Sequence, residues 1–174
     1  MKKFPEIVKL ATSFKPLRLT DIESWQEHIP FACVLMTLMA PKTFVELGTH
    51  KGDSYCSFCQ AIQESASNTQ AWAVDTWQGD NQAGLYDDEI YTELTAYHDP
   101  KYGQFSTLLR MRFDQALDKF ADHSIDLLHI DGLHTYEAVK EDFYSWLPKL
   151  SDQGVVLFHD TTVEAEDYGV DQLW

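Results

Sequence analysis

Five short apolar runs, separated by segments with helical periodicity, are the feature that most restricts how this chain can fold. The runs cover residues 43–48, 71–77, 107–113, 125–131 and 154–160. Parallel strands need long crossover connections, which are usually helices, so this alternation predicts a parallel sheet. We expect one α/β domain, a Rossmann-like doubly wound sheet with strand order 3-2-1-4-5 and helices on both faces.

Two helices can be predicted with their ends. Apolar residues recur at three-to-four spacing between Ile22 and Met36, which predicts a helix that begins at Thr20 or Asp21 and ends before Pro41. This helix would form a helical leader over residues 1–40, ahead of a ligand-binding domain over 41–174. A second apolar stripe predicts a helix over 135–150 that ends near its proline, and a third helix is expected over 87–98.

Composition excludes several kinds of partner. The chain has 28 acidic and 13 basic residues and a formal charge of -15, so its surface would repel nucleic acid and anionic membranes. The first 21 residues contain neither a signal-peptide core nor a spanning segment, which predicts a cytoplasmic protein. Three cysteines make no disulfide framework, and we expect buried thiols at Cys33, Cys56 and Cys59.

The first strand-to-helix turn reads ELGTHKGDSY. Gly48 permits a sharp turn after the strand and Gly52 stands where the next helix begins. The dinucleotide pattern GxGxxG and a phosphate loop ending in GK[ST] are both missing from this turn, which disfavours a dehydrogenase. Open α/β sheets bind ligands at the carboxyl ends of their strands, so the ligand of this turn is expected to lack a phosphate.

Acidic residues stand at or near four successive strand ends. Asp75 follows the second strand, where a carboxylate can accept both hydroxyls of a ribose. The full set is Glu46, Asp75, Asp114 and Asp131. One opposite-charge pair at 4 Å is worth roughly 4 kcal/mol at an effective dielectric of about 20, before desolvation. S-adenosylmethionine, which combines adenine, ribose and a sulfonium cation without a phosphate, fits both observations.

These segments resemble the class I S-adenosylmethionine-dependent methyltransferases. Within that class the chain is similar to the small O-methyltransferases that accompany bacterial glycosyltransferases and to the macrolide-sugar O-methyltransferases. The resemblance runs through VELGTHKGDSY, AVDTWQGDNQAGLYDDE, FSTLLRMRFDQAL and SIDLLHIDGLHTYEAVKEDFYSWLPKLSDQGVVLFHDTTV. It implies methyl transfer to a hydroxyl of a carbohydrate or glycosylated small molecule, with Asp131 at the reaction centre. It also implies that the cofactor contacts Glu46, Gly48, Gly52, Asp75 and Asp114. Of these, Asp114 would lie near the adenine.

Two histidines and a second acid are expected beside Asp131. His134 follows it in the same loop, and the fifth strand delivers His159 and Asp160 next to it, whereas His129 is predicted to be a core residue. Asp131 and Asp160 match the pattern of metal-dependent members, which would bind Mg²⁺ or another divalent cation. Thr161 would be a weak third ligand. General-base catalysis by His134 or His159 is the competing interpretation.

The insert over 78–104 and the end of the chain complete the sequence-based expectations. Aromatic and acidic residues of the insert suit either a sugar site or a surface helix with a packed aromatic face. Compared with the class I fold, the chain ends without the last two strands, which predicts a truncated domain and leaves a catalytically impaired binding or interaction module as the alternative function. The exposed edge of the fifth strand would then be covered by residues after Asp160 or by a symmetric homodimer. The acidic run over 163–174 favours the dimer.

Overall fold

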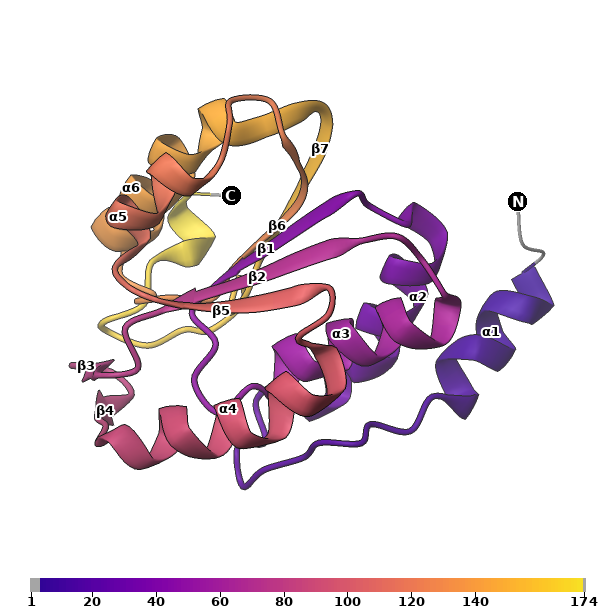
Figure 1. Cartoon of the computed structure of the whole chain (residues 1–174). Coiled ribbons are helices and arrows are strands. Elements are labelled where there is room, and N and C mark those ends of the chain that lie inside the picture. The colour runs from indigo at the N-terminus through magenta and orange to yellow at the C-terminus, as the bar shows by residue number, and fades with distance from the viewer. Residues whose placement is uncertain (1–3, 174) are drawn as a thin grey trace.

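The central sheet has the predicted architecture. The computed structural model describes residues 4–173, and its five parallel strands lie in the order β5-β2-β1-β6-β7 (Figure 1). This is the predicted order 3-2-1-4-5 in strand sequence, and the α/β fold class is confirmed. The strands of this sheet are β1 (Thr43–Leu47), β2 (Gln70–Asp75), β5 (Ser106–Arg110), β6 (Ile125–Ile130) and β7 (Leu150–Phe158).

Helices cover both faces of the sheet. In Figure 1, α2, α3 and α4 lie on one side and α5 and α6 on the other. The α-helices are α1 (Phe4–Ser13), α2 (Ile29–Met39), α3 (Asp53–Ser65), α4 (Asp88–Tyr102), α5 (Phe113–Ala116) and α6 (Tyr136–Trp146). Short 3-10 turns occupy Gln26–His28, Leu117–Lys119, Leu147–Lys149 and Val170–Gln172. The insert adds a small antiparallel pair, β3 (Gly79–Asp80) and β4 (Gly84–Leu85), that periodicity did not predict.

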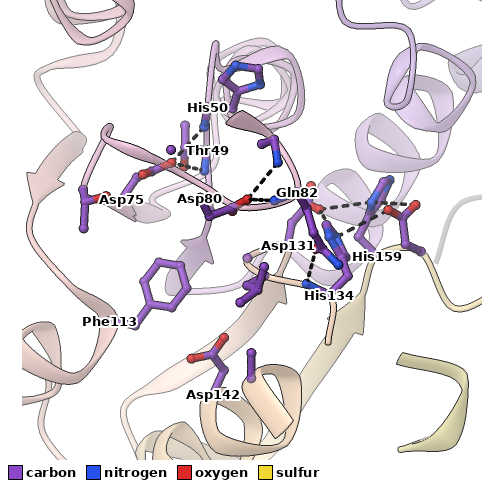
Figure 2. Close-up of a pocket in the computed structure, with 18 of the residues that line it drawn as sticks. Thr49, His50, Asp75, Asp80, Gln82, Phe113, Asp131, His134, Asp142 and His159 are labelled. Atoms are coloured by element: carbon purple, nitrogen blue, oxygen red, sulfur yellow. Dashed lines mark hydrogen bonds and ion pairs between the residues drawn. The ribbon is translucent and has the colours of Figure 1, made fainter. Parts of the chain in front are cut away.

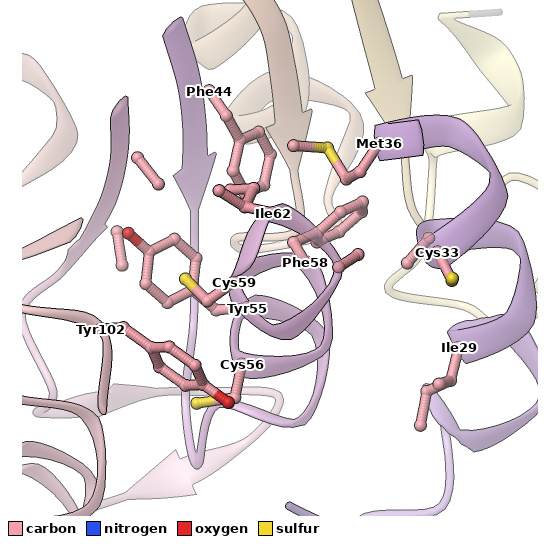
Figure 3. Packing of buried hydrophobic residues seen from close by; sticks show 14 of the residues in the cluster. Ile29, Cys33, Met36, Phe44, Tyr55, Cys56, Phe58, Cys59, Ile62 and Tyr102 are labelled. Atoms are coloured by element: carbon pink, nitrogen blue, oxygen red, sulfur yellow. The ribbon is translucent and has the colours of Figure 1, made fainter. Parts of the chain in front are cut away.

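Each face of the sheet has its own hydrophobic core. Between the sheet and α2 and α3, the Phe44 and Phe58 rings lie 4.7 Å apart and Met36 packs in the same cluster (Figure 3). The three cysteine thiols are buried as predicted, and burial raises the pKa of Cys56 to about 12, so this thiol is unreactive. On the other face, Trp146 of α6 is fully buried.

The predicted start of the leader helix was wrong. α2 begins at Ile29 rather than at Thr20, after a single 3-10 turn. Pro30 has no amide hydrogen, so it fits the first turn of a helix but not its interior. Thr20 instead uses its amide and its hydroxyl to bind the carboxylate of Asp53, each at 2.7 Å, which ties the leader to the start of α3.

The residues after β7 do not cover the edge of the sheet. Within the described chain β7 pairs only with β6, and Val155 on β7 is 38% exposed. The tail turns toward α6, where Val170 is buried and the Gly169 amide donates to the His134 carbonyl at 2.9 Å. The prediction that the tail folds back across the β7 edge was therefore wrong. The homodimer stays a prediction. Among residues 4–173, no helix combines the length and apolar character needed to cross a bilayer.

Candidate active site

A cavity of about 660 Å³ opens at the carboxyl ends of β1, β2, β5, β6 and β7 (Figure 2). It collects most of the predicted site residues, because parallel strands deliver their following turns to one edge of the sheet. Those that line it are Gly48, Asp75, Asp114, Asp131, His134, His159 and Asp160.

Asp75 is held in place by backbone amides. Its Oδ2 accepts hydrogen bonds from the amides of Thr49 at 2.8 Å and His50 at 2.9 Å, and its Oδ1 accepts one from the Trp77 amide at 2.7 Å. Carboxylate oxygens have further lone pairs, so the group can still accept from ligand hydroxyls. The turn after β1 and the carboxylate after β2 therefore form one rigid unit at the cavity wall.

Gly48 brings this unit against the reaction centre. It adopts φ +84, and a Cβ placed there would lie 2.0 Å from the Asp131 carbonyl oxygen. Any side chain at this position would therefore push apart the turns that follow β1 and β6.

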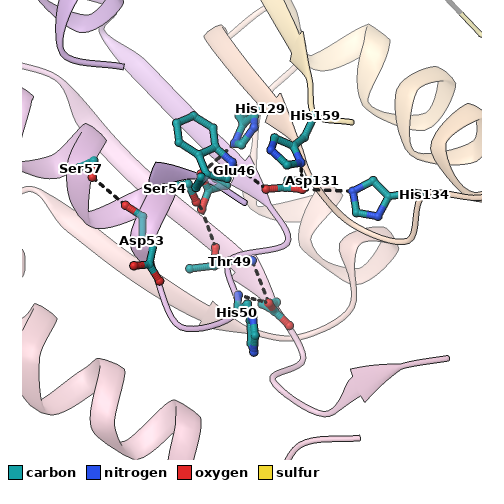
Figure 4. A network of polar contacts seen from close by, with 12 residues as sticks. Glu46, Thr49, His50, Asp53, Ser54, Ser57, His129, Asp131, His134 and His159 are labelled. Carbon is teal, nitrogen blue, oxygen red and sulfur yellow. Dashed lines mark hydrogen bonds and ion pairs between the residues drawn. The ribbon is translucent and has the colours of Figure 1, made fainter. Parts of the chain in front are cut away.

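Glu46 and Gly52 lie one layer behind the cavity wall rather than in it. The fully buried Glu46 carboxylate accepts from the hydroxyls of Thr49 and Ser54 at 3.0 and 3.1 Å and lies 2.8 Å from His129 Nδ1 (Figure 4). Burial raises the pKa of Glu46, and His129 opposes that rise. These contacts also confirm His129 as a core residue.

Gly52 is the N-cap of α3, and a Cβ there would meet Leu94 of α4 at 2.6 Å. Its position therefore supports helix packing. Glu46 and Gly52 thus position the first turn from behind, and their predicted cofactor contacts stay predictions.

Asp114 lies in the first turn of α5 at an exposed part of the cavity. Its carboxylate binds Arg112 Nε at 2.9 Å, and the Arg112 guanidinium lowers the pKa of Asp114. The group is therefore already paired before any ligand arrives.

The residues predicted at the reaction centre lie close together. Asp131 Oδ1 lies 3.2 Å from His134 Nε2 and 3.1 Å from His159 Nδ1 (Figure 4). Asp160, two residues after β7, adopts φ +54 and approaches the same two rings at 3.4 and 3.1 Å. Four ionisable groups thus share one end of the cavity.

The charges of this cluster support one another. Burial disfavours the charged forms, but the histidines beside Asp131 hold the pKa of that carboxyl far below its ordinary range. Burial likewise opposes charge on His159, yet Asp131 and Asp160 raise the pKa of His159 to about 10.

Comparison with known proteins assigns the chain to a family. Residues 45–161 match the sequence profile of a family described as a methyltransferase domain. The chain belongs to this methyltransferase domain family. The uncharacterized protein y4gI of Sinorhizobium fredii (strain NBRC 101917 / NGR234) is 45% identical over 179 residues, an alignment that covers 97% of this chain and 20% of that protein. The chain thus spans about one fifth of the length of this relative.

Solved structures share the fold of this methyltransferase domain. The O-methyltransferase TomG from Streptomyces achromogenes, involved in tomaymycin synthesis and solved with S-adenosylmethionine, gives a TM-score of 0.65 at 14% identity and covers 98% of this chain and 74% of its own. The Podospora anserina methyltransferase PaMTH1, solved with S-adenosylhomocysteine, gives a TM-score of 0.60 at 14% identity. The alignment covers 90% of this chain and 61% of PaMTH1. The narrower resemblance to glycan-modifying enzymes remains a prediction.

Three residues of the methyltransferase domain that contact the Asp131 cluster were missed in the sequence. Trp25 Nε1 donates to Asp131 Oδ2 at 3.0 Å and its ring stacks on His159, 5.7 Å between centroids. In the sequence Trp25 is one member of an apolar stripe, and no local signal marks its role.

Gln82 and Tyr168 close the same end of the cavity. Gln82 accepts from the His134 amide at 2.9 Å and donates to the Asp167 carbonyl at 2.7 Å, which joins the insert to the tail. The Tyr168 ring stacks on His134 at 5.1 Å. Both contacts span long sequence separations, so no spacing pattern could have found them.

Residues of the insert divide between a packed helix and the cavity wall. The helix predicted over 87–98 is α4, with Asp87 as its N-cap. Trp77 is fully buried against Tyr91, and Asp88 pairs with Arg110, so these residues are structural. Tyr86, stacked on His50 at 4.5 Å, lines the cavity.

Proposed function

We propose that this chain is an S-adenosylmethionine-dependent methyltransferase that transfers a methyl group to a hydroxyl oxygen. The observation that carries the proposal is that Asp75 and the Asp131 cluster line one cavity at the carboxyl edge of a methyltransferase fold. Its likeness to TomG and PaMTH1, solved with S-adenosylmethionine and S-adenosylhomocysteine, supports the same ligand.

The cavity suits a ligand of this composition. The ribose hydroxyls would bind Asp75 and the sulfonium would point toward Asp131, whose acidic surroundings favour a cation. An S-adenosylmethionine held this way supplies an electrophilic methyl carbon. As the new carbon–oxygen bond forms the sulfur–carbon bond breaks, and alignment of donor and acceptor could lower the barrier by roughly 7–11 kcal/mol.

The acceptor proton must leave as this bond forms. His134 faces the cavity from the loop after β6 and lies within hydrogen-bond distance of Asp131, which can orient its ring. His159 is packed between Trp25 and two carboxylates, so it suits holding Asp131 in place better than receiving a proton. In this mechanism His134 is the general base.

A divalent cation is the second candidate for activating the acceptor. Single ligand atoms of Asp131, His134 and His159 lie within 4.8 Å of one another. One carboxylate and two imidazoles suit a transition metal better than Mg²⁺, which prefers oxygen ligands. Such a cation would bind Asp131, with Asp160 beside it as the predicted second carboxylate, and would lower the pKa of the acceptor hydroxyl.

A carbohydrate hydroxyl is the proposed acceptor. Two aromatic rings, Tyr86 and Tyr168, and the carboxylate of Asp80 line the cavity. The Tyr168 ring lies against His134. Sugar rings present apolar faces that stack on aromatics and hydroxyls that need hydrogen-bond acceptors. The alternative, a binding module without catalysis, is not favoured, because the four reaction-centre groups are assembled together.

Binding and turnover together test the proposal. A thermal melt of the full chain should show stabilisation by S-adenosylmethionine and S-adenosylhomocysteine but not by NAD, about 2.7 kcal/mol at 100 times the dissociation constant. Labelled S-adenosylmethionine offered with a panel of neutral glycosides should then yield a labelled methyl ether. Stabilisation by NAD alone would exclude the proposed function. Binding without transfer to any hydroxyl would support the binding module.

A further inference from the structure

One face of α6 lines the cavity and includes a half-buried carboxyl group, that of Asp142. Ala138, Glu141, Asp142 and Ser145 recur at helical spacing along this face, whereas Val139 and Trp146 of the same helix are buried in the core. Of the two acids, Glu141 is exposed and Asp142 is half-buried. Among the described residues, the Asp142 carboxyl oxygens take part in no hydrogen bond or ion pair. The nearby Ser145 hydroxyl donates to the Asp142 backbone carbonyl at 3.1 Å instead.

Phe113 and Gly132 place an aromatic ring beside this carboxyl. A Cβ added at Gly132 would lie 2.7 Å from Phe113 Cε2 and 3.4 Å from Asp142 Oδ2. Glycine therefore keeps the space between ring and carboxyl open. Figure 2 shows Phe113 and Asp142 apart from the His134 and His159 cluster, at another part of the cavity.

The electrostatic surroundings leave this carboxyl in need of a hydrogen-bond donor. Burial raises the pKa of Asp142 to about 7, and the neighbouring Glu141 adds to the rise. The cation closest in sequence to Phe113, Arg112, already binds Asp114. A half-buried carboxyl without a partner is costly unless a ligand supplies a donor.

We propose that Asp142 recognises the adenine of bound S-adenosylmethionine by accepting a hydrogen bond from its exocyclic amine while the Phe113 ring covers a purine face. The inference rests on the proposed function and adds a specificity residue to it. Adenine presents two N–H donors at one edge and two apolar faces, which match the half-buried Asp142 carboxyl and the Phe113 ring. Asp114, the residue expected near the adenine from the sequence, has its carboxylate engaged by Arg112 and is less suited to this role.

The experiment measures the coupling between Asp142 and the amine. Calorimetry compares S-adenosylhomocysteine with an analogue that carries hydrogen in place of the 6-amino group, on the wild-type chain and on Asp142→Leu and Asp142→Asn. The wild type should prefer the amine by about tenfold, Asp142→Asn should keep most of that preference through its amide oxygen, and Asp142→Leu should lose it. Glu137→Gln, an exposed acid of α6 outside the cavity lining, is the matched control.

Each outcome has a separate meaning. An equal preference for the amine in wild type and Asp142→Leu, with both bound, overturns the role of Asp142 but leaves the proposed function intact. No binding of S-adenosylhomocysteine to the wild type overturns the proposed function itself. If Asp142→Leu fails to fold by circular dichroism, Asp142→Asn and the smaller Asp142→Ala decide, since a preference retained by Ala would also exclude the role.

Discussion

The two ends of the cavity are built in different ways. At the Asp75 end, backbone amides from Thr49, His50 and Trp77 fix the carboxylate. At the Asp131 end, side chains fix one another, and one of them, Trp25, comes from the other end of the chain. A site built on backbone tolerates changes around it, whereas a site built from mutually dependent side chains loses its geometry when one is changed. The two ends should therefore respond differently to substitution.

The largest expected effect is on transfer at the Asp131 end. Asp131→Asn removes the charge that pairs with His134 and His159, so transfer to the best acceptor of the panel should fall by about 10³-fold or more. Asp160→Asn should act in the same direction. Steady-state rates with labelled cofactor measure the loss. If activity survives both changes and prolonged chelation, the cation mechanism fails.

Gly48 tests the contact between the two ends. Gly48→Ala should lower the free energy of unfolding by about 2–4 kcal/mol, because the new methyl group would meet the Asp131 carbonyl and φ is positive. Gly84→Ala is the matched control, since Gly84 has a similar φ of +85 but nothing within 4 Å of a Cβ. It should cost only the conformational strain, about 1–2 kcal/mol. Equal losses of unfolding free energy in the two variants, measured by urea denaturation, would mean that the close approach of Gly48 to Asp131 does not affect stability.

A smaller effect is expected from the Trp25 contribution. Trp25→Phe removes the indole donor to Asp131 but keeps an aromatic ring against His159. Transfer should fall about tenfold, the value of one hydrogen bond to a charged group, with cofactor affinity unchanged. A parallel loss of cofactor affinity would show that Trp25 maintains the geometry of the whole cavity and not only that of the Asp131 cluster.

The smallest effect is on stability against pH. Because the pKa of Asp142 is raised from 3.8 to about 7, the folded chain keeps a proton that the unfolded chain releases. The contribution of protonated Asp142 to the free energy of unfolding is therefore fully present below about pH 4 and is lost as the pH rises through 7. At pH 8 the free energy of unfolding of Asp142→Asn should exceed that of wild type by about 1 kcal/mol, because solvent screens the charge of this half-buried group. At pH 4 the two proteins should differ little. A constant difference at both pH values in urea denaturation would contradict this.

The sequence predicted what depends on local pattern. The alternation of strands and helices predicted the doubly wound sheet and its strand order. The rule that parallel strands end at one edge then placed the Gly48 turn, Asp75, Asp131 and His159 together. Residues placed by tertiary contacts were missed, such as Trp25, which looks like any apolar helix residue. Glu46 could not be placed either, because only three-dimensional packing shows that its hydrogen bonds turn inward toward Thr49.

The most direct test of the difference between the two ends is a calorimetric titration of S-adenosylhomocysteine into wild type, Asp75→Ala and Asp131→Asn. Asp75→Ala should weaken binding by about 10–100-fold, because it removes the ribose acceptor and the anchor of the first turn. Asp131→Asn should bind within about threefold of wild type, since the nucleoside contacts lie elsewhere. Loss of affinity in Asp131→Asn together with unchanged affinity in Asp75→Ala would contradict the account.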